Sequence, residues 1–354
     1  MYSCAFYTLN AMQLSRHTEI SAQKEFTAFK LIENELSMVK RLINRQLTDS
    51  SGPAGQLVEK LNICGGKMLR PGLVLLSYHA VYDAMRKLDM LHSKQDTDIL
   101  IRIAAIVEMI HVATLLHDDV IDEGQKRRGA PTINSLYGNE SAVLLGDFLL
   151  SRVFGMCSNL QPQVIDIIAA ATARICEGEL RQLSRGQEWE LEESEYIDII
   201  TEKSAVLFSA CCRLGAFLAG ADEKHSKLLS DFGMNVGVAF QIADDLLDIT
   251  GDESKTGKTL GSDIYKNKPT LAVIHLLKMI DKVEKNSLIE RLNTDREDKK
   301  ELAKLLDQYG SFEYARRCAE GYIAKAKELL AGLKESDARN ALTETAQFAV
   351  SRAN

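Results

Sequence analysis

The chain is poor in proline, in aromatic residues and in paired cysteines. It has 5 prolines and 6% aromatic residues in 354 positions, which leaves little material for a strand-rich barrel or sandwich and makes long helices the default expectation. The 7 cysteines are odd in number and form no CxxC pair. A disulfide framework and a zinc site of that spacing are therefore excluded, and the pattern favours a reduced intracellular protein.

Basic charge is also scarce. The 43 lysines and arginines are outnumbered by 50 aspartates and glutamates, and the formal net charge is −7. No nucleic-acid partner is expected, because nucleic acids and anionic membranes are bound through basic patches. No uncharged run reaches the ~18 residues that a membrane-spanning helix needs, so no membrane span is expected. We expect a cytoplasmic protein, with peripheral membrane association left open, and a disordered or flexible segment over residues 1–20.

Apolar residues recur at helical spacing from about Glu25 onward. Ile99, Ile103, Ile106 and Ile110 step by three or four positions, which predicts a long helix that starts near N-cap candidates at 96–98 and runs to 117–119. The same pattern covers residues 69–88, 164–183, 195–218, 227–249, 311–330 and 336–350. We predict an all-α fold, a single-domain helical bundle over residues 21–354.

Two aspartate clusters share the spacing DDxxD, each at the end of an apolar predicted helix. They are Asp118, Asp119 and Asp122, and then Asp244, Asp245 and Asp248. Positions i and i+4 lie on one helix face, so the outer aspartates of each cluster project together. Carboxylates crowded at a helix C-terminus repel each other and the helix dipole, but suit Mg²⁺ that also binds phosphate. One cluster could be a solvated helix end, whereas two favour a metal-assisted diphosphate site.

Basic residues follow both clusters and also occur in a segment earlier in the chain. Arg127 and Arg128 come after the first cluster, and Lys258 and Lys268 after the second. Residues 65–71 read GGKMLRP, in which the glycines let an anion approach the backbone closely and Lys67 and Arg70 can grip phosphate oxygens. This segment alone is a weak signal, but beside the two clusters it suggests a second diphosphate site.

Taken together and in this order, these segments resemble the trans-isoprenyl diphosphate synthase family, and within it the polyprenyl (octaprenyl-type) branch. The resemblance rests on GGKMLRP at 65–71, IHVATLLHDDVIDEGQKRRGAPT at 110–132, GNESAVLLGDFLLSR at 138–152, EKSAVLF at 202–208, FQIADDLLDITGDESKTGKTLGSDIYKNKPTL at 240–271 and YGSFEYA at 309–315. It implies an isoprenoid-synthase bundle around a central cavity, and a homodimer. Met68 departs from the usual Arg, and 266–268 reads Lys-Asn-Lys where the family usually has Glu-Gly-Lys.

The resemblance also implies residue roles. The catalytic groups would be the six aspartates and Lys203. The direct ligands of Mg²⁺, three ions per site, would be Asp118, Asp122 and Asp244, while Asp119, Asp245 and Asp248 would act through metal-bound water. The allylic diphosphate would be held by Arg127, Lys203, Lys258 and Lys268, with Ser204 (usually Thr) and Gln241 as polar neighbours. Isopentenyl diphosphate would be bound by Lys67, Arg70, His111 and Arg128.

The implied reaction is head-to-tail chain elongation by a prenyltransferase. An allylic diphosphate, farnesyl or geranylgeranyl diphosphate, ionises, isopentenyl diphosphate attacks the cation, and a proton is eliminated. The small Ala113 and Thr114 lie one turn before Asp118, where an aromatic residue would block a growing chain, and the larger Ile110 and Met109 could form a floor. We therefore expect a long all-trans polyprenyl diphosphate for a quinone side chain, although small residues could also serve only close helix packing.

Three other functions stay open. One is a short-chain farnesyl or geranylgeranyl diphosphate synthase, and another is the partner subunit of a heteromeric synthase. Such subunits tend to lose aspartates, and both clusters here are intact. A terpene cyclase would carry an Asn/Ser/Glu metal motif in place of the second cluster and would not need the 65–71 segment.

Overall fold

The computed structural model describes residues 27–48, 53–61, 66–85, 93–127, 130–185, 189–250, 268–294 and 299–351. Within these ranges the chain is almost wholly helical, which confirms the all-α prediction. The helices are η1 (Ala28–Ile32), α2 (Glu33–Thr48), α3 (Pro53–Lys60), α4 (Leu69–Met85), α5 (Lys94–Ile121), α6 (Ile133–Tyr137), α7 (Asn139–Cys157), α8 (Pro162–Arg185), α9 (Glu193–Ile200), η3 (Thr201–Ala205), α10 (Val206–Leu218), α11 (Glu223–Thr250), α14 (Leu271–Met279), α15 (Lys282–Thr294), α16 (Lys299–Gln308), α17 (Ser311–Leu330) and α18 (Asp337–Ser351). The expected flexible segment at 1–20 lies outside the described residues.

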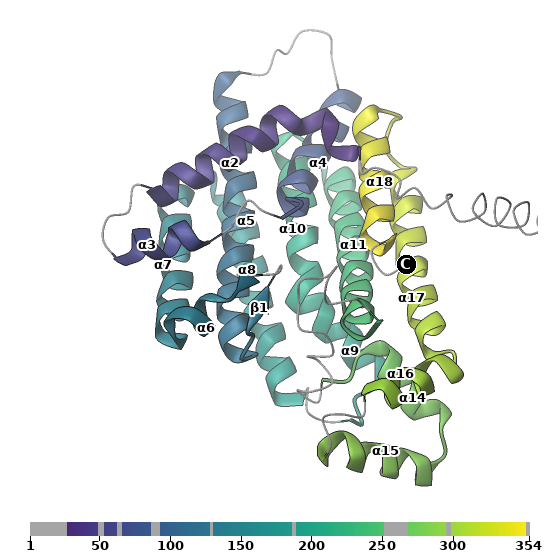
Figure 1. Cartoon of the computed structure of the whole chain (residues 1–354). Coiled ribbons are helices and arrows are strands. Elements are labelled where there is room, and N and C mark those ends of the chain that lie inside the picture. The colour runs from purple at the N-terminus through teal and green to yellow at the C-terminus, as the bar shows by residue number, and fades with distance from the viewer. Residues whose placement is uncertain are drawn as a thin grey trace, which may run out of the picture.

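Helix α5 lies within the bundle and packs against α2, α4, α7 and α10 (Figure 1). Every residue from Ile103 to Ile110 is buried. By length and composition α5 could cross a membrane, but 72% of its most apolar window is buried inside the protein. A helix that is apolar on all sides needs cover on all sides, and here the neighbouring helices supply it.

Ser93 is the N-cap of α5. Its hydroxyl accepts a hydrogen bond from the Asp96 backbone N–H, and the Asp96 carboxylate accepts one from the Ser93 backbone N–H. The predicted cap at 96–98 is therefore wrong by three residues, because Asp96 is the third-position partner of a capping box.

The predicted helices at 164–183, 227–249, 311–330 and 336–350 are confirmed as α8, α11, α17 and α18. The predicted helix at 195–218 is present but divided, with the π-helical turn η3 between α9 and α10. Helix α11 packs between α10 and α17, and α14, α15 and α16 gather at one end of the bundle (Figure 1). Two short strands, β1 (Lys126–Arg127) and β2 (Ala130–Pro131), pair antiparallel after α5.

Candidate active site

The two aspartate clusters lie at the C-terminal ends of α5 and α11. Arg127 interacts electrostatically with aspartates of both clusters. Burial disfavours this charge, but the hydrogen-bonded Asp119 raises the pKa of the guanidinium above its usual value. Asp118 and Asp244 raise the pKa further. One cation is therefore within electrostatic range of both clusters.

Strand β1 brings Arg127 back onto the end of α5. Its Nε donates to both carboxylate oxygens of Asp119, at 3.0 and 3.1 Å, and its Nη2 donates to Oδ1 at 2.8 Å. The Asn134 side chain fixes this turn by donating to the backbone carbonyls of Asp119 and Gly124, both at 3.0 Å. The buried Asp119 is thus neutralised by a bidentate partner of fixed orientation.

The other two aspartates of the first cluster also have basic neighbours. Lys268 Nζ lies 2.6 Å from Asp122 Oδ1. Lys203, on η3, places its Nζ 2.6 Å from Glu179 Oε2 and donates to Gln182 Oε1 at 2.8 Å. Burial opposes the charge on Lys203, but Asp118 and then Glu179 outweigh it and raise the lysine pKa above its usual value.

Two glycines allow η3 to lie between α8 and α11. A Cβ on Gly178 of α8 would lie 2.5 Å from the Lys203 backbone nitrogen, and one on Gly237 of α11 would lie 2.5 Å from Ala205 Cα. Real side chains do not tolerate such distances. The glycines therefore bring Lys203 and Ser204 against the helix that carries the second cluster.

A chain of hydrogen bonds holds the second cluster. The Ser204 hydroxyl donates to Gln241 Oε1 at 2.6 Å, and Gln241 Nε2 donates to Asp245 Oδ1 at 2.8 Å. The Tyr196 hydroxyl, from α9, donates to Asp245 Oδ2 at 2.6 Å. Both oxygens of Asp245 therefore accept from side chains on the protein, and the amide of Gln241 is held in one orientation.

In the described part of the chain, the acidic side chains of the site outnumber its cations. Burial raises the pKa of Asp118 to about 6; Lys203 opposes this shift, and Glu179 and Asp122 add to it. Among the described residues, no three Asp, Glu, His or Cys side chains form a ready-made metal site. This donor set, all carboxylate oxygens, fits Mg²⁺ that completes its ligands with water and a diphosphate, which is how Mg²⁺ is usually bound.

Lys67 and Arg70, predicted to bind isopentenyl diphosphate, both lie over aromatic rings. Lys67 Nζ is 3.8 Å from the ring centroid of Phe348, and Arg70 Cζ is 4.8 Å from that of Phe208. Phe208 packs against Phe240, with centroids 5.3 Å apart, directly before Gln241 on α11. Arg70 therefore lies over Phe208, and Phe208 in turn contacts Phe240 on the helix that carries the second cluster.

His111 lies half-buried on α5, two turns before Asp118, and its carbonyl accepts from the Thr114 hydroxyl at 2.8 Å. Arg128 and Lys258 lie outside the described residues, so their roles stay predictions.

The product-length candidates are Met109, Ile110 and Ala113, which are at most 2% exposed, and the half-buried Thr114. Their role and the central cavity also stay predictions.

The sequence reasoning missed three polar residues, Glu179, Gln182 and Tyr196. Glu179 and Gln182 lie three positions apart on α8, which places them on one helix face. Two polar residues on one face, next to Gly178, were the sequence signal that could have indicated a polar contact there. Tyr196 gives no such signal, since its partner Asp245 is 49 positions away.

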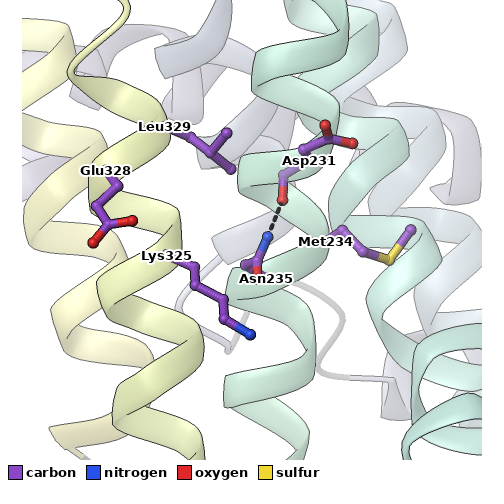
Figure 2. Close-up of a pocket in the computed structure, with 6 residues that line it drawn as sticks. All are labelled: Asp231, Met234, Asn235, Lys325, Glu328 and Leu329. Carbon is purple, nitrogen blue, oxygen red and sulfur yellow. Dashed lines mark hydrogen bonds between the residues drawn. The ribbon is translucent and has the colours of Figure 1, made fainter.

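An open pocket of about 470 Å³ lies between α11 and α17 (Figure 2), and neither aspartate cluster contributes to its lining. Its lining residues are Asp231, Met234, Asn235, Lys325, Glu328 and Leu329. Asn235 precedes Asp244 by nine positions on α11, or about 14 Å along the axis. With one lysine beside two carboxylates, this pocket does not have the charge to bind a diphosphate.

Comparison with known proteins gives one consistent result. A family model described as polyprenyl synthetase matches residues 54–309. An octaprenyl diphosphate synthase from Escherichia coli (strain K12) is 33% identical over 345 residues, 96% of this chain and 99% of that protein. A short chain isoprenyl diphosphate synthase from Methanothermobacter thermautotrophicus is 35% identical over 300 residues, 83% of this chain and 89% of that protein.

Among solved structures, the fold is similar to that of a polyprenyl synthase from Caulobacter crescentus CB15 complexed with calcium and isoprenyl diphosphate. The TM-score is 0.84 at 35% identity, over 92% of this chain and 97% of that one. An octaprenyl pyrophosphate synthase from Helicobacter pylori matches with a TM-score of 0.79 at 32% identity, over 90% and 99% of the two chains.

Proposed function

The chain belongs to the trans-isoprenyl diphosphate synthase family and is a prenyltransferase, and we propose that it elongates farnesyl or geranylgeranyl diphosphate to a long all-trans polyprenyl diphosphate. The observation that carries this proposal is the common site of the two aspartate clusters, with Arg127 in range of both and Lys203 beside Asp118. Relatives of this chain include short-chain, geranylgeranyl and octaprenyl synthases, so their names do not determine the product length. The proposal of a long product rests on Ala113 and Thr114.

Ionisation of the allylic diphosphate comes first. Arg127, Lys203 and Lys268 bind the diphosphate group and stabilise the charge that grows on it as the C–O bond breaks. Asp118, Asp122 and Asp244 would hold Mg²⁺, three ions in all, and the other aspartates would orient its waters. Bound Mg²⁺ supplies Lewis-acid charge at the leaving group.

Isopentenyl diphosphate then attacks the allylic cation. Lys67, Arg70, His111 and Arg128 hold its diphosphate, so that its double bond meets the cation in a fixed orientation. A proton is lost from the new carbon chain, and the departed diphosphate serves as the base. The buried apolar faces of α5, α10 and α11 keep water from the cation.

Small residues before the first cluster favour a long product. Ala113 and Thr114 leave room on α5 one turn before Asp118, and one turn of about 5.4 Å is close to the length of one isoprene unit. Ile110 and Met109 lie next along the helix and would set the floor. A quinone side chain is the fitting use of such a product.

We place the enzyme in the cytoplasm as a homodimer. Helices α7 and α8, which follow one another along the chain, expose large apolar side chains, with Leu144 at 67% and Phe154 at 73% on α7, and Leu180 at 66% and Leu183 at 50% on α8. Large exposed apolar side chains favour an interaction site, and a second copy related by a two-fold axis would cover the same residues on both chains.

The test is incubation of the purified chain with farnesyl diphosphate, labelled isopentenyl diphosphate and Mg²⁺, followed by chromatography of the dephosphorylated products. A labelled long-chain product is expected, and chelation of the metal should abolish it. Asp244→Asn should abolish incorporation, whereas Asp307→Asn, at an exposed position on α16, should leave it unchanged. A farnesyl- or geranylgeranyl-length product would make it a short-chain synthase. A cyclic hydrocarbon would make it a cyclase, and inactivity of the folded chain would point to a missing partner subunit.

A further inference from the structure

Tyr196 lies in a part of α9 that neither the aspartate motifs nor the basic segments include. Its ring is 4% exposed, and its hydroxyl reaches across to α11 to donate to Asp245 Oδ2 at 2.6 Å. A hydrogen bond to a carboxylate is shorter and stronger than one between neutral groups, and it fixes the rotamer of the acceptor. Tyr196 therefore acts on the position of the second cluster directly.

The effect extends beyond one carboxylate. Asp245 Oδ1 accepts from Gln241 Nε2, so the orientation of Asp245 determines which way the Gln241 amide faces. Gln241 Oε1 in turn accepts from Ser204, the residue next to Lys203 on η3. Tyr196, Asp245, Gln241 and Ser204 form one continuous chain from α9 through α11 to η3.

A second tyrosine holds the same helix through a residue one turn before Tyr196. Tyr314, in the YGSFEYA segment, donates to the Glu193 carboxylate at 2.8 and 3.0 Å. Glu193 lies three positions before Tyr196, on the same face of α9. The two tyrosines thus both tie α9 to a neighbouring helix, but only Tyr196 contacts an aspartate of the site.

We propose that Tyr196 is a positioning residue of the prenyl-transfer site, which fixes Asp245 and, through it, the Gln241 amide in the orientation that binds Mg²⁺ and the allylic diphosphate. This inference rests on the proposed function. Without the phenol hydroxyl, Asp245 samples other rotamers and the metal-loaded state becomes less populated, while the buried ring still packs.

The test measures isopentenyl diphosphate incorporation as a function of Mg²⁺ concentration. Tyr196→Phe is expected to raise the half-saturating Mg²⁺ concentration about tenfold, which corresponds to about 1.4 kcal/mol. In an Asp245→Asn background the same substitution is expected to change it less than about twofold, because the shared partner is already altered. Tyr314→Phe is the matched control, since it removes an equivalent hydrogen bond from α9, and it should leave the Mg²⁺ dependence unchanged.

Each other outcome overturns the inference. An unchanged Mg²⁺ dependence in Tyr196→Phe removes the positioning role. An equal shift in Tyr314→Phe assigns the effect to the general placement of α9, and a full tenfold shift in the Asp245→Asn background shows that Tyr196 acts elsewhere. Circular dichroism and the melting temperature confirm that each variant folds. Failure of the proposed function is distinguishable, because the wild-type chain would then incorporate no isopentenyl diphosphate or would stop at a short product, whereas the Mg²⁺ comparison needs incorporation alone.

Discussion

Replacement of Gly178 by alanine tests whether the position of Lys203 depends on the contact between α8 and η3. The new Cβ would lie 2.5 Å from the Lys203 backbone nitrogen and 2.8 Å from the Glu202 carbonyl carbon and Cβ. An ordinary contact begins at 3.4 Å, so the two backbones must separate by about 0.9 Å. Overpacking of this kind costs about 1–3 kcal/mol in the free energy of unfolding.

The same displacement should impair catalysis as well as stability. Lys203 Nζ is held 2.6 Å from Glu179 and 2.8 Å from Gln182, both on the helix that must move away. A misplacement of about 1 Å can reduce a rate ~100-fold, so we expect kcat/KM for the allylic substrate to fall about 10- to 100-fold. Steady-state incorporation assays measure this fall, and urea denaturation measures the change in stability.

Gly321→Ala is the matched control. Gly321 is exposed on α17, and its Cβ would meet nothing within 4 Å. Alanine in an exposed helical position should stabilise the chain by about 0.5–1 kcal/mol and leave activity unchanged. Wild-type stability and activity in Gly178→Ala would refute the reasoning that this glycine sets the distance between α8 and Lys203.

Three further predictions concern the product, the assembly and the thiols. Ala113→Phe should shorten the chain length seen by product chromatography, because the ring would fill the space one turn before the first cluster; an unchanged length would reject this placement of the growing chain. Phe154→Glu should convert the proposed dimer to monomers in sedimentation velocity, whereas Val283→Glu, at a position of similar exposure on α15, should not. Burial raises the pKa of Cys212 to about 12, so at pH 8 iodoacetamide should leave Cys212 unmodified in mass spectra of the folded chain and alkylate it in urea, and equal labelling in the two conditions would contradict its burial.

The helices were predictable because their apolar periodicity is local. Segments such as 311–330 carry a complete amphipathic pattern, and the structure begins and ends α17 at the predicted residues. The start of α5 was harder to place, since Ser93 and Asp96 are both good capping residues and only the backbone geometry decides which of them is the cap. The π turn η3 within the predicted helix at 195–218 gives no sign in the sequence, because it is fixed by close packing against glycines of other helices.

The aspartate clusters were predictable for a different reason: their spacing repeats, and acidic side chains at a helix C-terminus have no structural benefit. Their partners could not be predicted in the same way. Glu179 meets Lys203 across 24 positions and Tyr196 meets Asp245 across 49, through helix packing that no local pattern encodes. Sequence motifs therefore locate the groups proposed to bind substrate, whereas the groups that hold them in position emerge only from the fold.

The internal ion pairs explain how a site this acidic folds before substrate arrives. Within the described residues, Arg127 and Lys268 each hold an aspartate of the first cluster, while Lys203 is shared between Glu179 and the charge of Asp118. These same cations are the ones proposed to bind the allylic diphosphate. If Lys268 turns toward the diphosphate, it releases Asp122, one of the carboxylates proposed to bind Mg²⁺ directly. Binding of metal and of diphosphate should therefore be mutually dependent. When the ion pair breaks, the lysine needs the diphosphate as a new partner and the aspartate needs Mg²⁺.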